Sequence, residues 1–292
     1  MCSLRMKIYL INAKSILTKS GLPESDYVIN PYIGCMHGCV YCYARFMKRY
    51  TTYKEPWGNF VGVKLNAFEL LPNTPLRNKS VTISSVTDPY QPIEAKYKIT
   101  RRVLEHLVKL QPKLCVMTKS GLVLRDTELL KGFKDCIAGV SMSVLDKTLQ
   151  RSLEPRAASP EKRIRAVKLL KSAGLRTFVF ISPILPGLTQ WQDIVNRAGN
   201  YVDEIWFENL NITNVNWQSI RVWLQSNQPE LLGLYEKIYT SDKDYWARIE
   251  QEIARYSKRA KPRIKLYFHH KRVSQKRSAL NQRQHGSRQT QV

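Results

Sequence analysis

Short apolar runs alternate with segments of helical periodicity from residue 80 to about residue 210, and one further run precedes them. The runs are almost continuous in Val, Ile, Leu and Phe, which is typical of strands buried on both faces of a parallel sheet. We expect these strands at residues 27–31, 81–85, 114–118, 137–144, 176–182 and 204–210. Strands that alternate with helices of about 10–15 residues predict βαβ units. The pattern therefore predicts an α/β fold, and its six strands favour a partial (β/α)6 TIM-type barrel over a doubly wound sheet.

The helices between the strands have recognisable end signals. Ser159 is placed to cap the helix that follows it, and Gly174 comes just after the last turn of the same helix. Thr189 and Gln192 have the spacing of a capping box, and Asp126 is a cap candidate for a short helix. The other expected elements are helices at 42–50 and 101–110 and a small strand at 61–65.

These elements divide the chain into four parts. A polar lead-in (1–26) precedes the barrel (27–211). Residues 212–270 have mostly helical patterns and are expected to form a cover packed on the barrel, although 264–268 could be a packed strand. The basic tail (271–292) is rich in Gln, Arg and Ser and is expected to be disordered.

The balance of charges narrows the choice of partner. The chain has 47 Lys and Arg against 23 Asp and Glu, a formal net charge of +24, and eleven of the positive residues lie after Ser257, where there is no acid. A surplus of this size indicates a polyanionic partner, most often nucleic acid, and a solvated basic surface is the alternative. No apolar run approaches the roughly 20 residues of a membrane span, so we expect no membrane partner.

Three of the six cysteines are clustered, which is not the pattern of a disulfide framework and favours a reducing cytoplasm as the location. Cys35, Cys39 and Cys42 have the spacing C-x₃-C-x₂-C. Thiolates at this density bind soft metals, and iron–sulfur clusters are held by cysteine thiolates. Three thiolates would hold three irons of a [4Fe–4S] cluster and leave the fourth iron open to a small molecule. The alternative is a zinc site with His37 as the fourth ligand, although His37 lies inside the loop, where reaching the same metal is awkward.

The spacing, with Tyr41 directly before the last cysteine, resembles the cluster motif of the radical S-adenosylmethionine (SAM) superfamily. The resemblance implies that the open iron chelates the amino and carboxylate groups of SAM. It also implies that an electron from the cluster cleaves SAM to a 5′-deoxyadenosyl radical. The implied cofactors are therefore a [4Fe–4S] cluster and SAM, and the implied partner is an electron donor such as a flavodoxin or a ferredoxin.

Polar residues follow the carboxyl ends of the expected strands, where a barrel of this type carries its chemistry. Small hydroxyls, one lysine and carboxylates are suited to the carboxylate, ammonium and ribose groups of SAM. They are Ser84, Ser85, Thr87, Asp88, Thr118, Lys119, Ser120, Ser141, Ser143, Ser182 and Glu208. Each type has a structural alternative, because such hydroxyls also cap helices, an aspartate before proline also makes a turn, and a lysine is commonly exposed.

Two other cysteines and four of the histidines are expected to have no chemical role. Cys115 and Cys136 fall at the beginnings of two strands, at the wrong end of the barrel, so we expect ordinary buried cysteines. The histidines without an expected role are His106, His269, His270 and His285.

Longer motifs resemble those of the spore photoproduct lyase-like branch of radical SAM proteins. They are Cys-x-His-Gly-Cys-Val-Tyr-Cys-Tyr-Ala-Arg at 35–45, Ser-Ser-Val-Thr-Asp-Pro-Tyr-Gln-Pro-Ile-Glu at 84–94, Thr-Lys-Ser at 118–120, Arg-Asp at 125–126 and Glu-Pro at 154–155. This resemblance implies that Thr87, Lys119 and Ser143 contact SAM, with Tyr41 and Tyr43 flanking the last cluster cysteine. In that branch the lyase opens a thymine–thymine photoproduct in DNA, a DNA-repair reaction.

One position departs from that branch. The lyase has a cysteine just before this Thr-Asp pair, which returns a hydrogen atom to the product radical, and the matching residue here is Ser85. An O–H bond is much stronger than an S–H bond, so serine is a poor hydrogen donor. We therefore expect the radical chemistry without the named repair reaction, and the catalytic candidates are Tyr41, Tyr43 and Ser85. Two alternatives stay open: a peptide or small-molecule substrate, and a nucleic-acid-binding protein with a structural zinc site.

Overall fold

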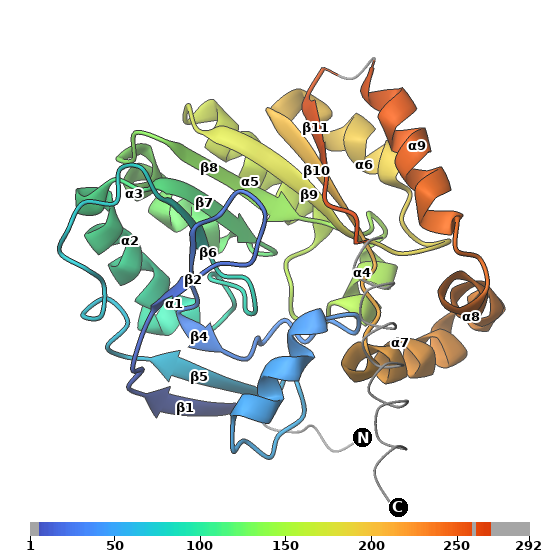
Figure 1. Ribbon diagram of the computed structural model, residues 1–292, viewed down its shortest axis with the longest axis horizontal. Coiled ribbons are helices and arrows are strands. Elements are labelled where there is room, and N and C mark those ends of the chain that lie inside the picture. The colour runs from blue at the N-terminus through green and yellow to red at the C-terminus, as the bar shows by residue number, and fades with distance from the viewer. Residues whose placement is uncertain (1–5, 259–260, 270–292) are drawn as a thin grey trace, which may run out of the picture.

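The computed structural model describes residues 6–258 and 261–269 of the chain. Its main sheet has eight strands in the order β11-β10-β9-β8-β7-β6-β3-β2, with helices on its outer side (Figure 1). Six neighbouring strands run parallel and in chain order. They are β3 (Tyr27–Ile29), β6 (Ser80–Ile83), β7 (Lys113–Thr118), β8 (Cys136–Ser141), β9 (Arg176–Ile184) and β10 (Glu204–Asn209). The expected α/β fold with a mostly parallel sheet is therefore confirmed.

Helices connect these strands, as parallel neighbours require. The helix α5 (Pro160–Ser172) has the expected ends, since the Ser159 side chain accepts a hydrogen bond from the backbone N of Lys162 and Gly174 has a φ of +87°. Val167 and Leu170 of α5 are fully buried. The other covering elements are α1 (Glu94–Tyr97), α2 (Ile99–Leu110), η2 (Gly121–Asp126), α3 (Thr127–Lys131), α4 (Lys147–Leu153), α6 (Trp191–Ala198) and η3 (Gly199–Tyr201).

Of the expected helix-end signals, the capping box is absent, and Asp126 is at the expected N-cap position but makes no capping contact. The helix α6 begins at Trp191, and the Thr189 hydroxyl accepts a hydrogen bond from the backbone N of Leu185 (2.8 Å), so Thr189 stabilises the preceding turn and not a capping box. The Asp126 side chain does not cap α3. It is buried and accepts a hydrogen bond from Arg101 (2.8 Å), because an ion pair satisfies a buried carboxylate better than one backbone N–H.

The N-terminal region contains strands that its sequence pattern does not predict. β1 (Lys7–Ile11) pairs with β5 (Phe60–Lys64), the small strand that the sequence does predict, and β4 (Tyr32–Ile33) completes a three-stranded sheet. β2 (Leu17–Lys19) is antiparallel to β3 at the edge of the main sheet. The lead-in is therefore integrated into both sheets.

The C-terminal region first forms helices and then returns to the barrel. α7 (Asn214–Asn227), η4 (Pro229–Leu231), α8 (Leu232–Thr240) and α9 (Tyr245–Ser257) follow β10 (Figure 1). β11 (Arg263–Leu266) then pairs in parallel with β10, so the strand considered for 264–268 is present. The tail expected at 271–292 lies outside the described residues. None of the helices in the described part of the chain is long and apolar enough to cross a membrane.

Candidate active site

The three clustered cysteines lie in a loop between β4 and the 3₁₀ helix η1 (Tyr43–Tyr50). The cysteines of the described residues are all free thiols, and Cys35 and Cys39 are buried. Gly34 precedes the loop with a φ of +80°, and a Cβ at this position would lie 2.7 Å from the Phe60 ring. Only glycine fits this close approach, so the start of the loop is fixed by the packing of β5.

Two polar side chains hold the backbone of the cysteine loop. Gln91 accepts a hydrogen bond from the backbone N of Met36 (2.7 Å). The Arg156 guanidinium donates hydrogen bonds to the carbonyl oxygens of Met36 (3.0 Å) and Gly58 (2.6 Å). The backbone N of Val40 donates to the carbonyl of Leu153 (2.9 Å). The loop is therefore held from both sides, which keeps the thiols in a fixed arrangement.

The surroundings of the thiols fit an iron–sulfur cluster. Nε of Arg45 and Nε1 of Trp57 are buried without a hydrogen-bond partner in the described part of the chain. Both groups lie close enough to Cys42 to lower the pKa of its thiol, against the larger opposite effect of burial. Iron–sulfur clusters are tuned by hydrogen bonds to their sulfur atoms and by nearby charge. Three free thiols beside unsatisfied N–H groups are therefore a suitable set of ligands and donors.

His37, the fourth ligand of the zinc alternative, faces a carboxylate. Its Nδ1 lies 3.4 Å from Oδ2 of Asp88, and burial lowers the pKa of the ring, against the effect of Asp88. Asp88 also accepts hydrogen bonds from the Thr118 hydroxyl (2.6 Å) and from the backbone N of Lys119 (2.8 Å). Asp88 therefore does more than make a turn: it joins the cysteine loop to the ends of β6 and β7.

Lys119 lies at the same end of the barrel as the thiols. Its Nζ donates to the Ser141 hydroxyl (2.6 Å) and lies 5.8 Å from the centre of the Tyr41 ring. Burial raises the pKa of the Cys39 and Cys42 thiols, and the positive charge of Lys119 partly opposes this rise. The structure thus brings the expected SAM-binding lysine next to the expected cluster ligands.

The hydroxyl groups of Ser143 and Tyr41 lie beside a buried ion pair. The Ser143 hydroxyl lies 3.4 Å from the Tyr41 hydroxyl, which in turn donates to the Glu154 carboxylate. Glu154 pairs with Arg163, and both side chains are at most 1% exposed. Burial alone would raise the pKa of Glu154, but Arg163 and then Lys119 lower it to about 2. The carboxylate therefore stays ionised and fixes the Tyr41 ring under Lys119.

Thr87 is placed at the loop by its own hydrogen bonds. Its hydroxyl donates to the Gly34 carbonyl (2.5 Å) and accepts from Gln91 (3.0 Å). The structure therefore shows Thr87 stabilising the cysteine loop, and contact with SAM stays a prediction for this residue.

The other two catalytic candidates also lie together. The Tyr43 hydroxyl donates a hydrogen bond to the backbone carbonyl of Ser85, and the Tyr43 side chain is partly exposed. Asn30 holds the same segment through the backbone N of Ser85 (3.0 Å). Tyr43 and Ser85 thus line one side of the barrel mouth.

Sequence reasoning expected Ser182 and Glu208 at the mouth but missed His269, which lies beside them. His269 Nε2 lies 2.7 Å from Oε1 of Glu208, and the Ser182 hydroxyl donates to Oε2 of Glu208 (2.5 Å). Partial burial and then the charge of Glu208 raise the pKa of the Tyr43 hydroxyl, so this carboxylate lies within electrostatic range of the tyrosine. The strand-like composition of residues 264–268 was the signal that could have located His269. β11 pairs with β10, and this pairing places the following His269 beside the end of β10.

Cys115 and Cys136 lie where the sequence predicts. Cys136 is the first residue of β8 and Cys115 is near the start of β7, away from the mouth. Burial raises the pKa of both thiols, to about 12 for Cys115. Neither thiol belongs to the cluster of functional residues.

Residues 29–198 match the model of the radical SAM superfamily. The chain belongs to this superfamily. An uncharacterized protein of Methanocaldococcus jannaschii is 38% identical over 226 residues, which are 77% of this chain and 85% of the relative. The radical SAM Nalpha-GlyT isomerase of Pseudomonas phage M6 is 26% identical over 168 residues, 56% of this chain and 34% of the isomerase.

Solved structures resemble the fold of this radical SAM protein over most of its chain. Spore photoproduct lyase complexed with dinucleoside spore photoproduct superposes with a TM-score of 0.63 at 16% identity, over 90% of this chain and 82% of the lyase. At this identity the likeness shows the partial barrel fold alone.

Membership of the superfamily establishes the class of chemistry. The protein is a radical SAM enzyme, its cofactors are a [4Fe–4S] cluster and SAM, and it needs an electron donor. The family therefore decides between the two metal alternatives in favour of the cluster.

Proposed function

We propose that this radical SAM enzyme holds its cluster through Cys35, Cys39 and Cys42, binds SAM beside Lys119, and acts on a nucleic acid. The observation that carries the proposal is the proximity of Lys119 to Tyr41 and to the Cys39 and Cys42 thiols at the carboxyl ends of the barrel strands. Active sites of barrels built in this way lie at that end.

The chain's own residues supply binding and orientation. When bound, the cluster and SAM supply a 5′-deoxyadenosyl radical that abstracts hydrogen from a substrate. Lys119 offers an ammonium to the SAM carboxylate, and the Ser143 hydroxyl offers a neutral polar contact. The Glu154–Arg163 pair keeps the Tyr41 ring in place between these groups.

The charge of the chain supports a nucleic-acid substrate. A net charge of +24 favours a polyanion through the release of condensed counterions. The partly exposed Tyr43 lies at the mouth, where an aromatic ring is suited to stack on a base. The solved lyase with a similar fold is described as a complex with dinucleoside spore photoproduct, which is compatible with this class of substrate.

Anaerobic reconstitution followed by measurement of 5′-deoxyadenosine tests the proposal. Parallel reactions would contain DNA, RNA or buffer alone, with dithionite as the reductant. We expect 5′-deoxyadenosine in all three and an increase with the nucleic acid that contains the substrate. Equal amounts of 5′-deoxyadenosine with and without nucleic acid, together with more 5′-deoxyadenosine when a peptide pool is added, would favour the peptide alternative.

A matched variant separates the cluster from the substrate. Cys42→Ala should abolish 5′-deoxyadenosine and leave salt-dependent nucleic-acid binding unchanged. Loss of both properties would mean that the variant has lost its fold, which circular dichroism would show.

A further inference from the structure

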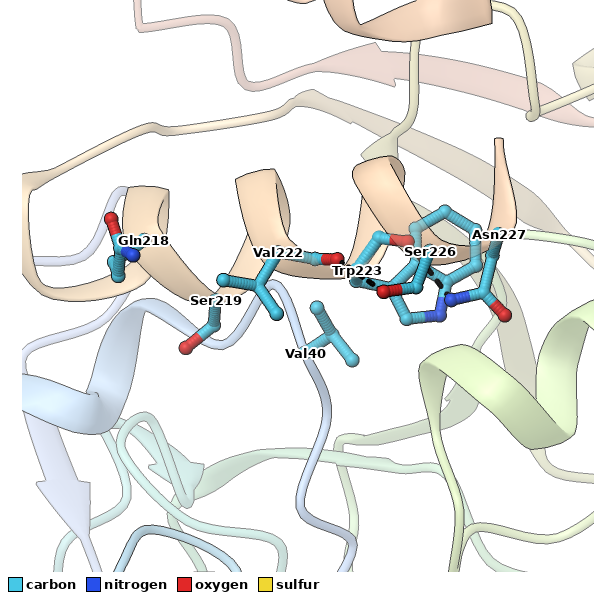
Figure 2. A pocket seen from close by; sticks show the side chains of 7 residues that line it. All are labelled: Val40, Gln218, Ser219, Val222, Trp223, Ser226 and Asn227. Atoms are coloured by element: carbon cyan, nitrogen blue, oxygen red, sulfur yellow. Dashed lines mark hydrogen bonds between the residues drawn. The ribbon is translucent and has the colours of Figure 1, made fainter. Parts of the chain in front are cut away.

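A groove of about 470 Å³ lies between α7 and the cysteine loop (Figure 2). Val222 and Trp223 of α7 form its apolar part, and Gln218 and Ser219 lie at one end. Val222 is 50% exposed, although it is a large apolar side chain. A surface with an apolar centre and a polar rim has the anatomy of an interaction site.

The floor of the groove belongs to the cysteine loop. Val40, which lies between Cys39 and Cys42, lines the groove opposite α7 (Figure 2). The buried Asn216 of α7 donates a hydrogen bond to the backbone carbonyl of Tyr41 (3.1 Å), which fixes the helix on the loop. A partner seated in the groove would therefore be separated from a cluster ligand by a single residue.

Two consecutive side chains of the cysteine loop, Val40 and Tyr41, lie in different places. The Tyr41 ring lies under Lys119 in the SAM site, whereas the neighbouring Val40 side chain lines the groove. A protein that docks at Val40 therefore leaves the barrel mouth free for SAM and substrate.

The cysteine loop contacts the basic helix α4 through Val40. The carbonyl of Leu153, the last residue of α4, accepts the hydrogen bond of the Val40 N–H (2.9 Å). On the exposed side of α4, Lys147 and Arg151 line a second hollow. The groove itself is lined by uncharged residues, whereas α4, which the loop contacts through Val40, has two exposed basic side chains and no acid. This combination complements a protein with an acidic rim.

We propose that this groove is the docking site of the electron donor, an acidic one-electron carrier protein. The proposal rests on the proposed function, because it takes Cys39 and Cys42 as cluster ligands. Electron transfer rates fall steeply with distance, so a carrier must approach the loop closely, and the groove gives that approach. A nucleic acid suits the groove less well, because the residues that line it carry no positive charge to neutralise phosphate.

Two variants test the docking site. Val222→Asp places a negative charge in the apolar centre of the groove, and the double variant Lys147→Glu with Arg151→Glu reverses the charge of these two residues on α4. The control is Lys109→Glu, an exposed residue of α2 on another side of the barrel. Each protein would be titrated with oxidised flavodoxin by isothermal calorimetry, which needs no reduced cluster. The reconstituted proteins would then be reduced by flavodoxin hydroquinone or by dithionite, with visible absorbance as the readout.

We expect both variants to bind flavodoxin about tenfold more weakly and to be reduced by it about tenfold more slowly, with the control unchanged. Reduction by dithionite should be the same in all four proteins, since a small reductant needs no docking site. Wild-type flavodoxin affinity in both variants would overturn the proposal, and so would an equal loss of rate with dithionite. A wild type that dithionite cannot reduce would instead contradict the proposed function, while the calorimetric comparison would still decide the docking site.

Discussion

Lys119 Nζ donates a hydrogen bond to the Ser141 hydroxyl over 2.6 Å, which links the carboxyl ends of β7 and β8. This partner is neutral, and an ammonium has three donors, so the lysine keeps capacity for an anionic ligand. The Tyr41 ring supports the ammonium from the cysteine loop. Lys119 is therefore held in position at the place where the SAM carboxylate is expected.

Removing this ammonium should weaken SAM binding. A hydrogen bond to a charged group contributes about 1.5–3 kcal/mol, so Lys119→Ala should lower SAM affinity about 10–150-fold. Isothermal calorimetry on the anaerobically reconstituted enzyme measures this, and iron content should not change. Lys131→Ala is the control, because Lys131 pairs with Glu128 on α3. Unchanged SAM affinity in the first variant would remove Lys119 from the site.

The sequence could predict the strands and the residues that end them, because local chemistry decides both. The strands of the barrel are buried on both faces and therefore read as apolar runs, and β8, which is buried throughout, is the clearest case. The sequence pattern does not predict β1, because this strand is not buried on both faces. Ile8 and Leu10 are exposed, so β1 is not a core strand like those of the barrel. Its place depends on pairing with β5, nearly 50 residues away, which no local signal contains.

The same distinction applies to the site. Cys35, Cys39 and Cys42 could be found by their spacing, since one loop must place all three ligands. The residues that hold this loop could not, because Gln91 and Arg156 act over long separations in the sequence. His269 belongs with them, because only the pairing of β11 with β10 brings it to the mouth.

Replacing any one of Cys35, Cys39 and Cys42 by alanine should abolish the visible absorbance of the cluster and the cleavage of SAM. The reason is that each thiolate would hold a different iron. Iron and sulfide analysis after anaerobic reconstitution measures the loss. Cys136→Ala is the control, because this buried thiol lies at the start of β8. A triple variant that keeps a full iron content would contradict the assignment.

The buried pair of Glu154 and Arg163 should be strongly stabilising only as a pair. Glu154→Gln leaves the fully buried Arg163 without a counter-charge, so it should lower the free energy of unfolding by about 3–5 kcal/mol. Urea denaturation measures this value. The control Glu128→Gln removes an exposed ion pair with Lys131 and should change the free energy of unfolding by less than about 1 kcal/mol. A loss of similar size in both variants would contradict a special role for the buried pair.

The same carboxylate predicts a dependence of stability on pH. The pKa of Glu154 is lowered from 4.5 to about 2 in the folded protein, so its contribution is fully present above about pH 4.5. That contribution should be lost as the pH falls from about 4.5 towards 2, because the unfolded chain then binds a proton that the folded chain does not. The stability difference between wild type and Glu154→Gln should therefore shrink over this range, and a constant difference would contradict the assignment.

The basic tail should add to nucleic-acid binding without reading sequence. Removing residues 274–292 takes away four positive charges, Lys276, Arg277, Arg283 and Arg288. If all four neutralise phosphates, the log–log slope of duplex affinity against salt should become shallower by about 3.6. Fluorescence anisotropy with a labelled duplex at several salt concentrations measures the slope. An identical slope for the truncated and full chains would show that residues 274–292 make no phosphate contacts.

Ser85 lies where the lyase branch is expected to hold its hydrogen-donating cysteine, and the Tyr43 hydroxyl donates to the carbonyl of this residue. A serine O–H bond is too strong to quench a carbon radical efficiently, whereas a tyrosine O–H bond is weaker. We therefore expect wild-type protein given photoproduct-containing DNA to cleave SAM but to recover little intact thymine. Liquid chromatography with mass spectrometry of the digested DNA measures the products.

Two substitutions distinguish the possible hydrogen donors in this reaction. Ser85→Cys should raise the recovery of thymine if the mouth accepts this substrate, because a thiol then lies at the position of the lyase donor. Tyr43→Phe should leave the cluster and SAM affinity unchanged and should lower any residual recovery, since it removes the weaker O–H bond. The double variant Tyr41→Phe with Tyr43→Phe controls for donation by the other tyrosine. Efficient and clean repair by the wild type that persists in the double variant would contradict the inference that this chain lacks the lyase's donor.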